Sequence, residues 1–241
     1  MKKRASVIAL GLRLNWAVVL LCIVLTCVLQ GWLFWRQQSM WGGVEFDSGY
    51  TIGYEHILEN NGISTVGKAG FFSLLIGLTA CCASPQTGMT LRRLRLREWE
   101  VTAWWTMIFF GYFLLFWAVQ LGMLLWTFHM YAQVRGWDLM DLFISAHTSP
   151  YFHIVLPLSE PWAVVRNIFL CLSWALTAAL GALEARHGGK PFTVLVVGLS
   201  TNVFLPTTMA SAVGDMAAIS ILGCILAGYI WAMQGRVKHE D

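Results

Sequence analysis

The chain has 241 residues, of which 57% are hydrophobic and only 12% are charged. A soluble domain carries about 25% charged residues, so this composition excludes an ordinary soluble domain and favours a membrane protein. The formal net charge of +3 says little, because the charged residues are segregated along the chain, and we expect no nucleic-acid partner. The 13 tryptophans are typical of a protein with two long interfaces against lipid headgroups.

Six apolar segments are long enough to cross a membrane, since roughly 20 apolar residues span about 30 Å of hydrocarbon. They are 14–35, 66–84, 101–131, 162–183, 192–209 and 215–233. The sequence therefore predicts an all-α, polytopic membrane protein with six transmembrane helices in a single transmembrane domain, 1–241. No small-residue cleavage site follows the first segment, so we expect that segment to be retained as a span. The third segment is longer than a bilayer needs, which predicts a tilted helix or a protruding end.

The basic residues gather on one side of these predicted spans. If the spans alternate, both termini share a side with 85–100 and 184–191. Twelve of the 16 lysines and arginines then fall on that side: Lys2, Lys3, Arg4, Arg13, Arg92, Arg93, Arg95, Arg97, Arg186, Lys190, Arg236 and Lys238. Short loops rich in Lys and Arg stay in the cytoplasm, so both termini are predicted to be cytoplasmic. The loops 36–65 and 133–161 are predicted to be external, and the turn between the last two spans is either a simple turn or a re-entrant hairpin.

The stretch Thr90–Glu100 is the most distinctive on this predicted cytoplasmic side. It places four arginines in six residues, and leucines alternate with them. One interpretation is that the arginines only prevent translocation and contact anionic lipid, at about 1 kcal/mol each. The interleaved leucines and Trp99 favour more than that, namely a helix lying along a surface and receiving force from another protein. The candidate coupling residues are Thr90, Leu91, Arg92, Arg93, Leu94, Arg95, Leu96, Arg97 and Glu98.

Six spans in about 240 residues, cytoplasmic ends and a TLRRL-x-L-x-E element between spans two and three resemble the permease subunits of bacterial ABC transporters, in particular the type-2 exporter-like family. The resemblance implies that Thr90–Glu98 is a coupling helix that docks on a separate ATPase. It also implies that Met1–Leu14 is an interfacial elbow helix and that an external hairpin joins spans five and six.

By this resemblance the chain is a multi-pass permease in a bacterial plasma membrane that exports an amphipathic, peptide or lipid-like substrate. Its partners are a homodimeric ABC ATPase, a second permease copy or a homologous permease, and membrane lipid. The chain itself is not an enzyme, because ATP is hydrolysed on the partner. We expect it to have no catalytic, cofactor-binding or metal-binding residues and no cofactor.

Other motifs have simpler interpretations. Gly62–Lys68 matches the start of a P-loop, but Ala69 stands where Ser or Thr should bind Mg²⁺, and Lys68 is expected to snorkel at the membrane surface. The scattered histidines form no metal or haem motif, and the six cysteines fall in apolar segments as packing residues. Gln120, midway along the third span, is expected to hydrogen-bond a neighbouring helix as a packing contact.

Two other classes of function were weighed against transport. A membrane enzyme needs a nucleophile and a base, or paired carboxylates, at matching depth in the spans, and the sequence offers no convincing pair. A non-transporting sensor or scaffold, which binds a partner through the loops 36–65 and 133–161, remains the alternative.

Overall fold

The computed structural model describes residues 2–41, 62–83, 98–135, 149–156 and 161–187, together with residues 54, 57, 58, 140, 144 and 194 and parts of 214–230. Its helices are α1 (Lys2–Trp41), α3 (Ile63–Cys82), α5 (Glu98–Arg135), α7 (Pro150–Val155) and α8 (Pro161–Arg186). The residues in these ranges form no β-strand, so the described part of the chain is all-helical, as predicted.

Four of these helices, α1, α3, α5 and α8, are long and apolar enough to cross a membrane. They coincide with the first four predicted spans, and α5 is longer than a bilayer needs, as the sequence predicted. The fifth predicted span (192–209) and much of the sixth (215–233) lie outside the described residues. Six spans and cytoplasmic termini therefore stay predictions.

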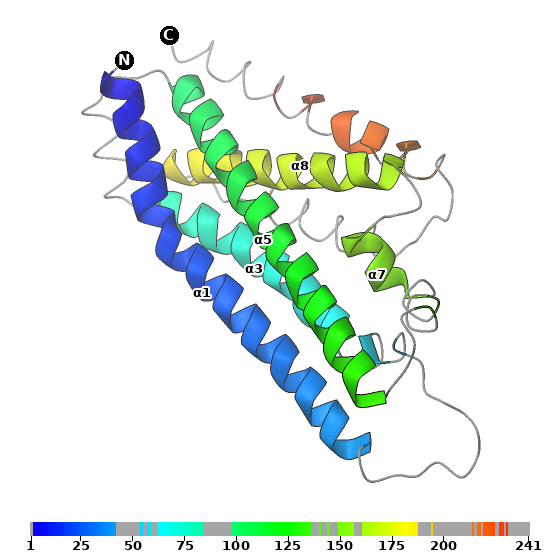
Figure 1. The fold of residues 1–241 in the computed structure, drawn as a ribbon. Coiled ribbons are helices and arrows are strands. Elements are labelled where there is room, and N and C mark those ends of the chain that lie inside the picture. Colours follow the sequence, from blue (N-terminus) through cyan, green and yellow to red (C-terminus); the bar gives the residue numbers. More distant parts are fainter. Residues whose placement is uncertain are drawn as a thin grey trace.

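The helices alternate in direction (Figure 1). Helices α1 and α5 run side by side the same way, whereas α3 runs against them. Asn15 near the start of α1 donates from Nδ2 to Sγ of Cys82, the last residue of α3 (3.4 Å), and Gln30 near the end of α1 donates to the carbonyl of Ile63, the first residue of α3 (3.2 Å). We call the end that holds the starts of α1 and α5 the proximal end, and the other the distal end. Helix α8 ends on the proximal side, as α3 does.

Small residues allow these helices to pack closely. A Cβ at Gly70 of α3 would lie 2.6 Å from Thr26 Oγ1 of α1, and one at Gly77 would lie 2.6 Å from Val18 Cγ1. Lipid tails are as apolar as Leu, so close van der Waals packing of this kind, rather than a hydrophobic driving force, holds membrane helices together. The α1–α3 contact thus depends on glycines at these positions.

The most extensive helix–helix interface joins α5 to α8. On α8, four alanines with helical spacing are buried in the same apolar cluster as the aromatic side chains of α5. The fully buried aromatic and alanine members of this cluster on the two helices are Trp105, Phe109, Phe113, Phe116, Ala175, Ala178, Ala179 and Ala182. Large side chains on one helix and small ones on the other allow the two surfaces to interdigitate.

The N-terminal part of α1 corrects one expectation. The segment Met1–Leu14 was expected to form a separate elbow helix, but Lys2–Leu14 continues into the span as one helix of 40 residues, about 60 Å long at 1.5 Å per residue. Val7, Gly11 and Asn15 are buried on one face of it, at four-residue spacing. This buried stripe packs the segment against the bundle, where an elbow would lie apart from it.

Candidate functional site

The predicted coupling residues lie at the edge of what the structure describes. Thr90, Leu91, Arg92, Arg93, Leu94, Arg95, Leu96 and Arg97 lie outside the described residues, and Glu98 is the first residue of α5. Their flanks are described: α3 ends at Cys82 and α5 begins at Glu98, both on the proximal side (Figure 1). The two helices that flank the segment therefore end and begin at the same end of the bundle as the start of α1.

In the distal half, three buried polar side chains from three helices meet, and we call them the polar cluster: Gln30 of α1, Gln120 of α5 and Tyr151 of α7. Gln30 Nε2 donates to Gln120 Oε1 (2.9 Å), and the Tyr151 hydroxyl donates to the same oxygen (3.0 Å). All three side chains are at most 5% exposed. The expectation that Gln120 hydrogen-bonds a neighbouring helix is confirmed, and the bond joins α5 to α1 and α7.

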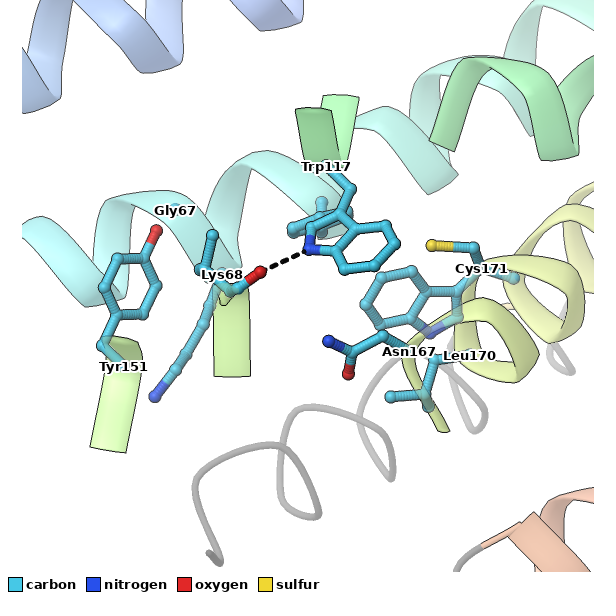
Figure 2. Close-up of a pocket in the computed structure, with 10 residues that line it drawn as sticks. Gly67, Lys68, Trp117, Tyr151, Asn167, Leu170 and Cys171 are labelled. Atoms are coloured by element: carbon cyan, nitrogen blue, oxygen red, sulfur yellow. Dashed lines mark hydrogen bonds between the residues drawn. The ribbon is translucent and has the colours of Figure 1, made fainter. Parts of the chain in front are cut away.

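The local sequence of α7 sets the position of Tyr151. The Ser149 hydroxyl accepts from the Phe152 amide (3.4 Å) as an N-cap, and Pro150 follows at the first helical position, where its missing N–H loses nothing. At the other end of α7, the Trp117 indole of α5 donates from Nε1 to the Val155 carbonyl (3.0 Å), the dashed line in Figure 2. The short helix is thus fixed at both ends.

Gly67 of α3 provides the space for the cluster. A Cβ there would collide with the Tyr151 hydroxyl and would lie 3.0 Å from both Gln120 Oε1 and Gln30 Nε2. The stretch Gly62–Lys68, which matched the start of a P-loop, is not a loop here. Gly62, with φ of 77°, precedes α3 in the left-handed conformation, and Ile63–Lys68 form its first turns. Gly67, the second glycine of that match, has no side chain and so leaves room for the Tyr151 hydroxyl.

The polar cluster leaves two hydrogen-bonding atoms unused. Gln30 Oε1 and Gln120 Nε2 are buried and have no hydrogen-bond partner in the part of the chain that the structure describes. Their side chains are 2% and 1% exposed. An unsatisfied buried polar group costs about 1–3 kcal/mol. One buried acceptor and one buried donor are therefore available to a ligand or to water.

Two hollows adjoin the cluster, and Tyr151 lines both. The larger, about 440 Å³ including its open mouth, lies between α3, α5, α7 and α8 and has walls of Phe71, Trp117 and Trp174 (Figure 2). The smaller, about 210 Å³, is lined by Gln30, Gln120 and Tyr151 together with apolar side chains and Thr127. Figure 2 shows the Tyr151 hydroxyl pointing toward α3 at Gly67.

The side chains that line the smaller hollow are neutral, whereas Lys68 is among the residues that line the larger one. Burial raises the pKa of Tyr151 to about 12, against a small opposing effect of its hydrogen bond with Gln30. Burial likewise raises the pKa of Tyr54, whose hydroxyl shares a hydrogen bond with Thr127 (2.8 Å). No carboxylate, imidazole or basic group is among the residues that line the smaller hollow. The site is suited to binding by hydrogen bonds and apolar contacts.

Sequence reasoning missed Gln30, Tyr151 and Gly67 as members of this site. Gln30 was visible as the one strongly polar side chain in the middle of its apolar stretch, between Thr26 and Arg36. Tyr151 carried no such signal, because it sits in a predicted external loop and its burial depends on where α7 folds back. Among the described residues, no three His, Cys, Asp or Glu side chains gather closely enough to hold a metal ion.

The described residues thus form an all-helical bundle with four helices able to cross a membrane and a neutral polar cluster between three of its helices. No protein family, no curated protein and no solved structure matches the chain.

Proposed function

We propose that this chain is the transmembrane permease subunit of an ATP-driven ABC exporter. A separate ATPase, expected as a homodimer, docks on Thr90–Glu98 and supplies the energy. The observation that carries the proposal is the position of the two helices that flank that arginine-rich segment. Helix α3 ends at Cys82 and α5 begins at Glu98, both at the proximal end of the bundle.

Both helices attached to the segment also contribute to the candidate site. Helix α3 carries Gly67, and α5 carries Gln120 and Trp117. A force on the connecting segment therefore acts on two walls of the larger hollow together. Transport by this route is a rigid-body switch of packed helices, and ATP drives it only if the ATPase makes different contacts in the two states.

The aromatic walls of the larger hollow favour an amphipathic, peptide or lipid-like cargo over an ion. In the proposed orientation the proximal end faces the cytoplasm of a bacterial cell, because Arg13 lies in the proximal part of α1 and the two helices that flank the arginine-rich segment end and begin there. The proposed assembly spans the plasma membrane with six helices per chain, and a second copy or a homologous permease completes the route.

One observation favours the alternative, a membrane sensor or scaffold. Two segments of the predicted external loops pack into the distal end: Tyr54 and Leu58 are 0% and 1% exposed, and α7 is bonded to α5. A partner that binds these loops therefore acts directly on the helices. In that alternative the arginine-rich segment contacts lipid or a signalling protein, and no ATPase binds.

The experiment that decides is co-purification of the full chain with candidate ATPases, combined with the substitutions Arg92→Glu, Arg93→Glu and Arg95→Glu. We expect the triple variant to lose the complex and at least about tenfold of ATP-driven transport, equivalent to about 1.4 kcal/mol of coupling. The matched control is Arg236→Glu with Lys238→Glu, which reverses charge on the same predicted side and leaves both activities unchanged. Retained complex and undiminished transport in the triple variant would refute the exporter proposal.

A further inference from the structure

The smaller hollow is bordered by two amide groups whose orientation is fixed by their neighbours. The Ile63 carbonyl only accepts hydrogen bonds, so the atom of Gln30 that faces it (3.2 Å) must be Nε2. The atom of Gln120 that faces this nitrogen (2.9 Å) must then be the acceptor Oε1, which the Tyr151 hydroxyl also bonds (3.0 Å). Gln30 Oε1 and Gln120 Nε2 are therefore the atoms left over, and neither has a partner among the described residues.

The room in this hollow fits one very small molecule. Its 210 Å³ include the gaps between the lining side chains and its open side, and the centre of a water molecule fits within only about 10 Å³ of it. That is about the space that a single buried water molecule needs. A lipid chain, a peptide or any larger ligand is excluded from this hollow by its size.

Water also has the chemistry that the two leftover atoms require. One water molecule can accept a hydrogen bond from Gln120 Nε2 and donate one to Gln30 Oε1. A metal cation offers the nitrogen no acceptor, and the residues that line the hollow carry no charge to balance one. Buried waters typically make about three hydrogen bonds, and the lining includes two further side chains with hydroxyl groups, Thr127 and Tyr151.

We propose that the smaller hollow is the binding site of one ordered water molecule, which accepts from Gln120 Nε2 and donates to Gln30 Oε1. The Thr127 hydroxyl in the wall of this hollow shares a hydrogen bond with the Tyr54 hydroxyl (2.8 Å). The water therefore lies between the polar cluster and a residue of the predicted external loop 36–65. This site goes beyond the proposed exporter and does not depend on it.

The test is the transfer of magnetisation from water protons to side-chain amides, measured by solid-state NMR on the isotope-labelled full chain in phosphatidylcholine bilayers. The matched control is the amide of Asn15, which is 0% exposed and whose Nδ2 already donates to the Gly11 carbonyl (2.8 Å) and to Cys82 Sγ (3.4 Å). We expect transfer to Gln120 Nε2 to be at least about threefold faster than transfer to Asn15 Nδ2, because a bonded water lies beside only the former. Equally slow transfer to both amides would mean that the hollow is dry and would overturn the proposal. Transfer from acyl-chain protons in place of water protons would mean that lipid fills the hollow and would overturn it as well.

A variant shows whether Gln30 holds the water. Gln30→Met keeps the length of the side chain and removes its acceptor, and we expect transfer to Gln120 Nε2 to fall about threefold, to the level of Asn15. Thr106→Val is the control on the same helix as Gln120. Its hydroxyl bonds the Thr102 carbonyl one turn away (2.9 Å), and we expect its loss to leave the transfer unchanged. Unchanged transfer in Gln30→Met would refute the assignment of the water to the two glutamines.

If Gln30→Met does not fold, the comparison of Gln120 with Asn15 in the unaltered chain still decides the question. The measurement needs neither ATP nor an ATPase, so a dry hollow removes the water site and leaves the exporter proposal untouched. Transport that survives the arginine substitutions removes the exporter and leaves the water site.

Discussion

The proximal and distal halves of the bundle share three long helices, α1, α3 and α5, yet they are built from different side chains. Toward the proximal end, fully buried aromatic residues of α5 share an apolar cluster with alanines of α8, and buried hydroxyls such as those of Thr79 and Thr106 bond carbonyls of their own helix. In the distal half, Gln30, Gln120 and Tyr151 meet beside two hollows. Both halves contain the same three helices, so the difference between them comes from the volume and polarity of their side chains.

The comparison teaches how one bundle separates stability from binding. Close packing maximises van der Waals contact, which is the main stabilising interaction between helices in lipid. Hollows and unsatisfied amides lower stability, so a chain retains them at a functional position. The proximal half thus holds the helices together, and the distal half carries the unsatisfied polar atoms.

The largest expected effect comes from a substitution that creates a cavity in the close-packed proximal half. Phe113→Ala removes a side chain that is 0% exposed and lies against Trp174, with ring centroids 5.6 Å apart. We expect the free energy of unfolding to fall by about 3–5 kcal/mol, as for large-to-small changes in close-packed cores. Titration of the purified chain from mild detergent into SDS measures it.

The control for that change is Leu115→Ala, two residues away on the same helix but 49% exposed. We expect it to alter the unfolding free energy by less than about 1 kcal/mol, because it opens no cavity. Equal losses in the two variants would mean that the aromatic–alanine interface is not the stabilising core.

The next effect tests the glycine beneath the polar cluster. Gly67→Ala places a methyl group against the Tyr151 hydroxyl and both glutamines, and we expect a loss of about 2–3 kcal/mol from overpacking. Gly111→Ala on α5 is the matched control, since nothing lies within 4 Å of its added Cβ. There alanine's helix propensity stabilises by up to about 1 kcal/mol. The same SDS titration measures the unfolding free energy of both variants. An unchanged unfolding free energy for Gly67→Ala would show that Tyr151 has room to move aside.

Much of the fold was predictable from the sequence, because four apolar stretches of sufficient length are a strong signal. The elbow helix expected over Met1–Leu14 came from the family resemblance alone, whereas Lys2–Leu14 continues into α1 with Val7, Gly11 and Asn15 buried on one face. Gln120 was predicted as a polar contact, yet its partners were not. Tyr151 reaches it only because α7 folds back onto the bundle, and that depends on tertiary contacts such as the bond from Trp117 to Val155. Periodicity reports which face is apolar, but it does not report which loop covers that face.

A pH titration tests whether the buried Tyr151 hydroxyl stays protonated in the folded state. Burial raises the pKa of Tyr151 to about 12 from the ordinary value of 10, so the folded state favours the protonated hydroxyl. This contribution is complete below pH 10 and is lost as pH rises through 12, by about 2 kcal/mol at pH 12. The measurement is the unfolding free energy from pH 9 to 12 for the unaltered chain and for Tyr151→Phe. We expect their difference to shrink over that window, and a constant difference would mean that Tyr151 is accessible to solvent.

The smallest expected effect is the most informative about function. Gln120→Leu removes the bonds from Gln30 and Tyr151, and hydrogen bonds between membrane helices average only about 0.6 kcal/mol each. It also removes the unpartnered Nε2, which offsets part of that loss. We therefore expect the unfolding free energy to fall by about 1 kcal/mol or less, far below the effect of Phe113→Ala. A loss of 3 kcal/mol or more, on the scale of a core substitution, would mean that the polar cluster holds the helices together just as the packed half does. The contrast between the two halves would then disappear, and Gln120 would be explained by stability alone.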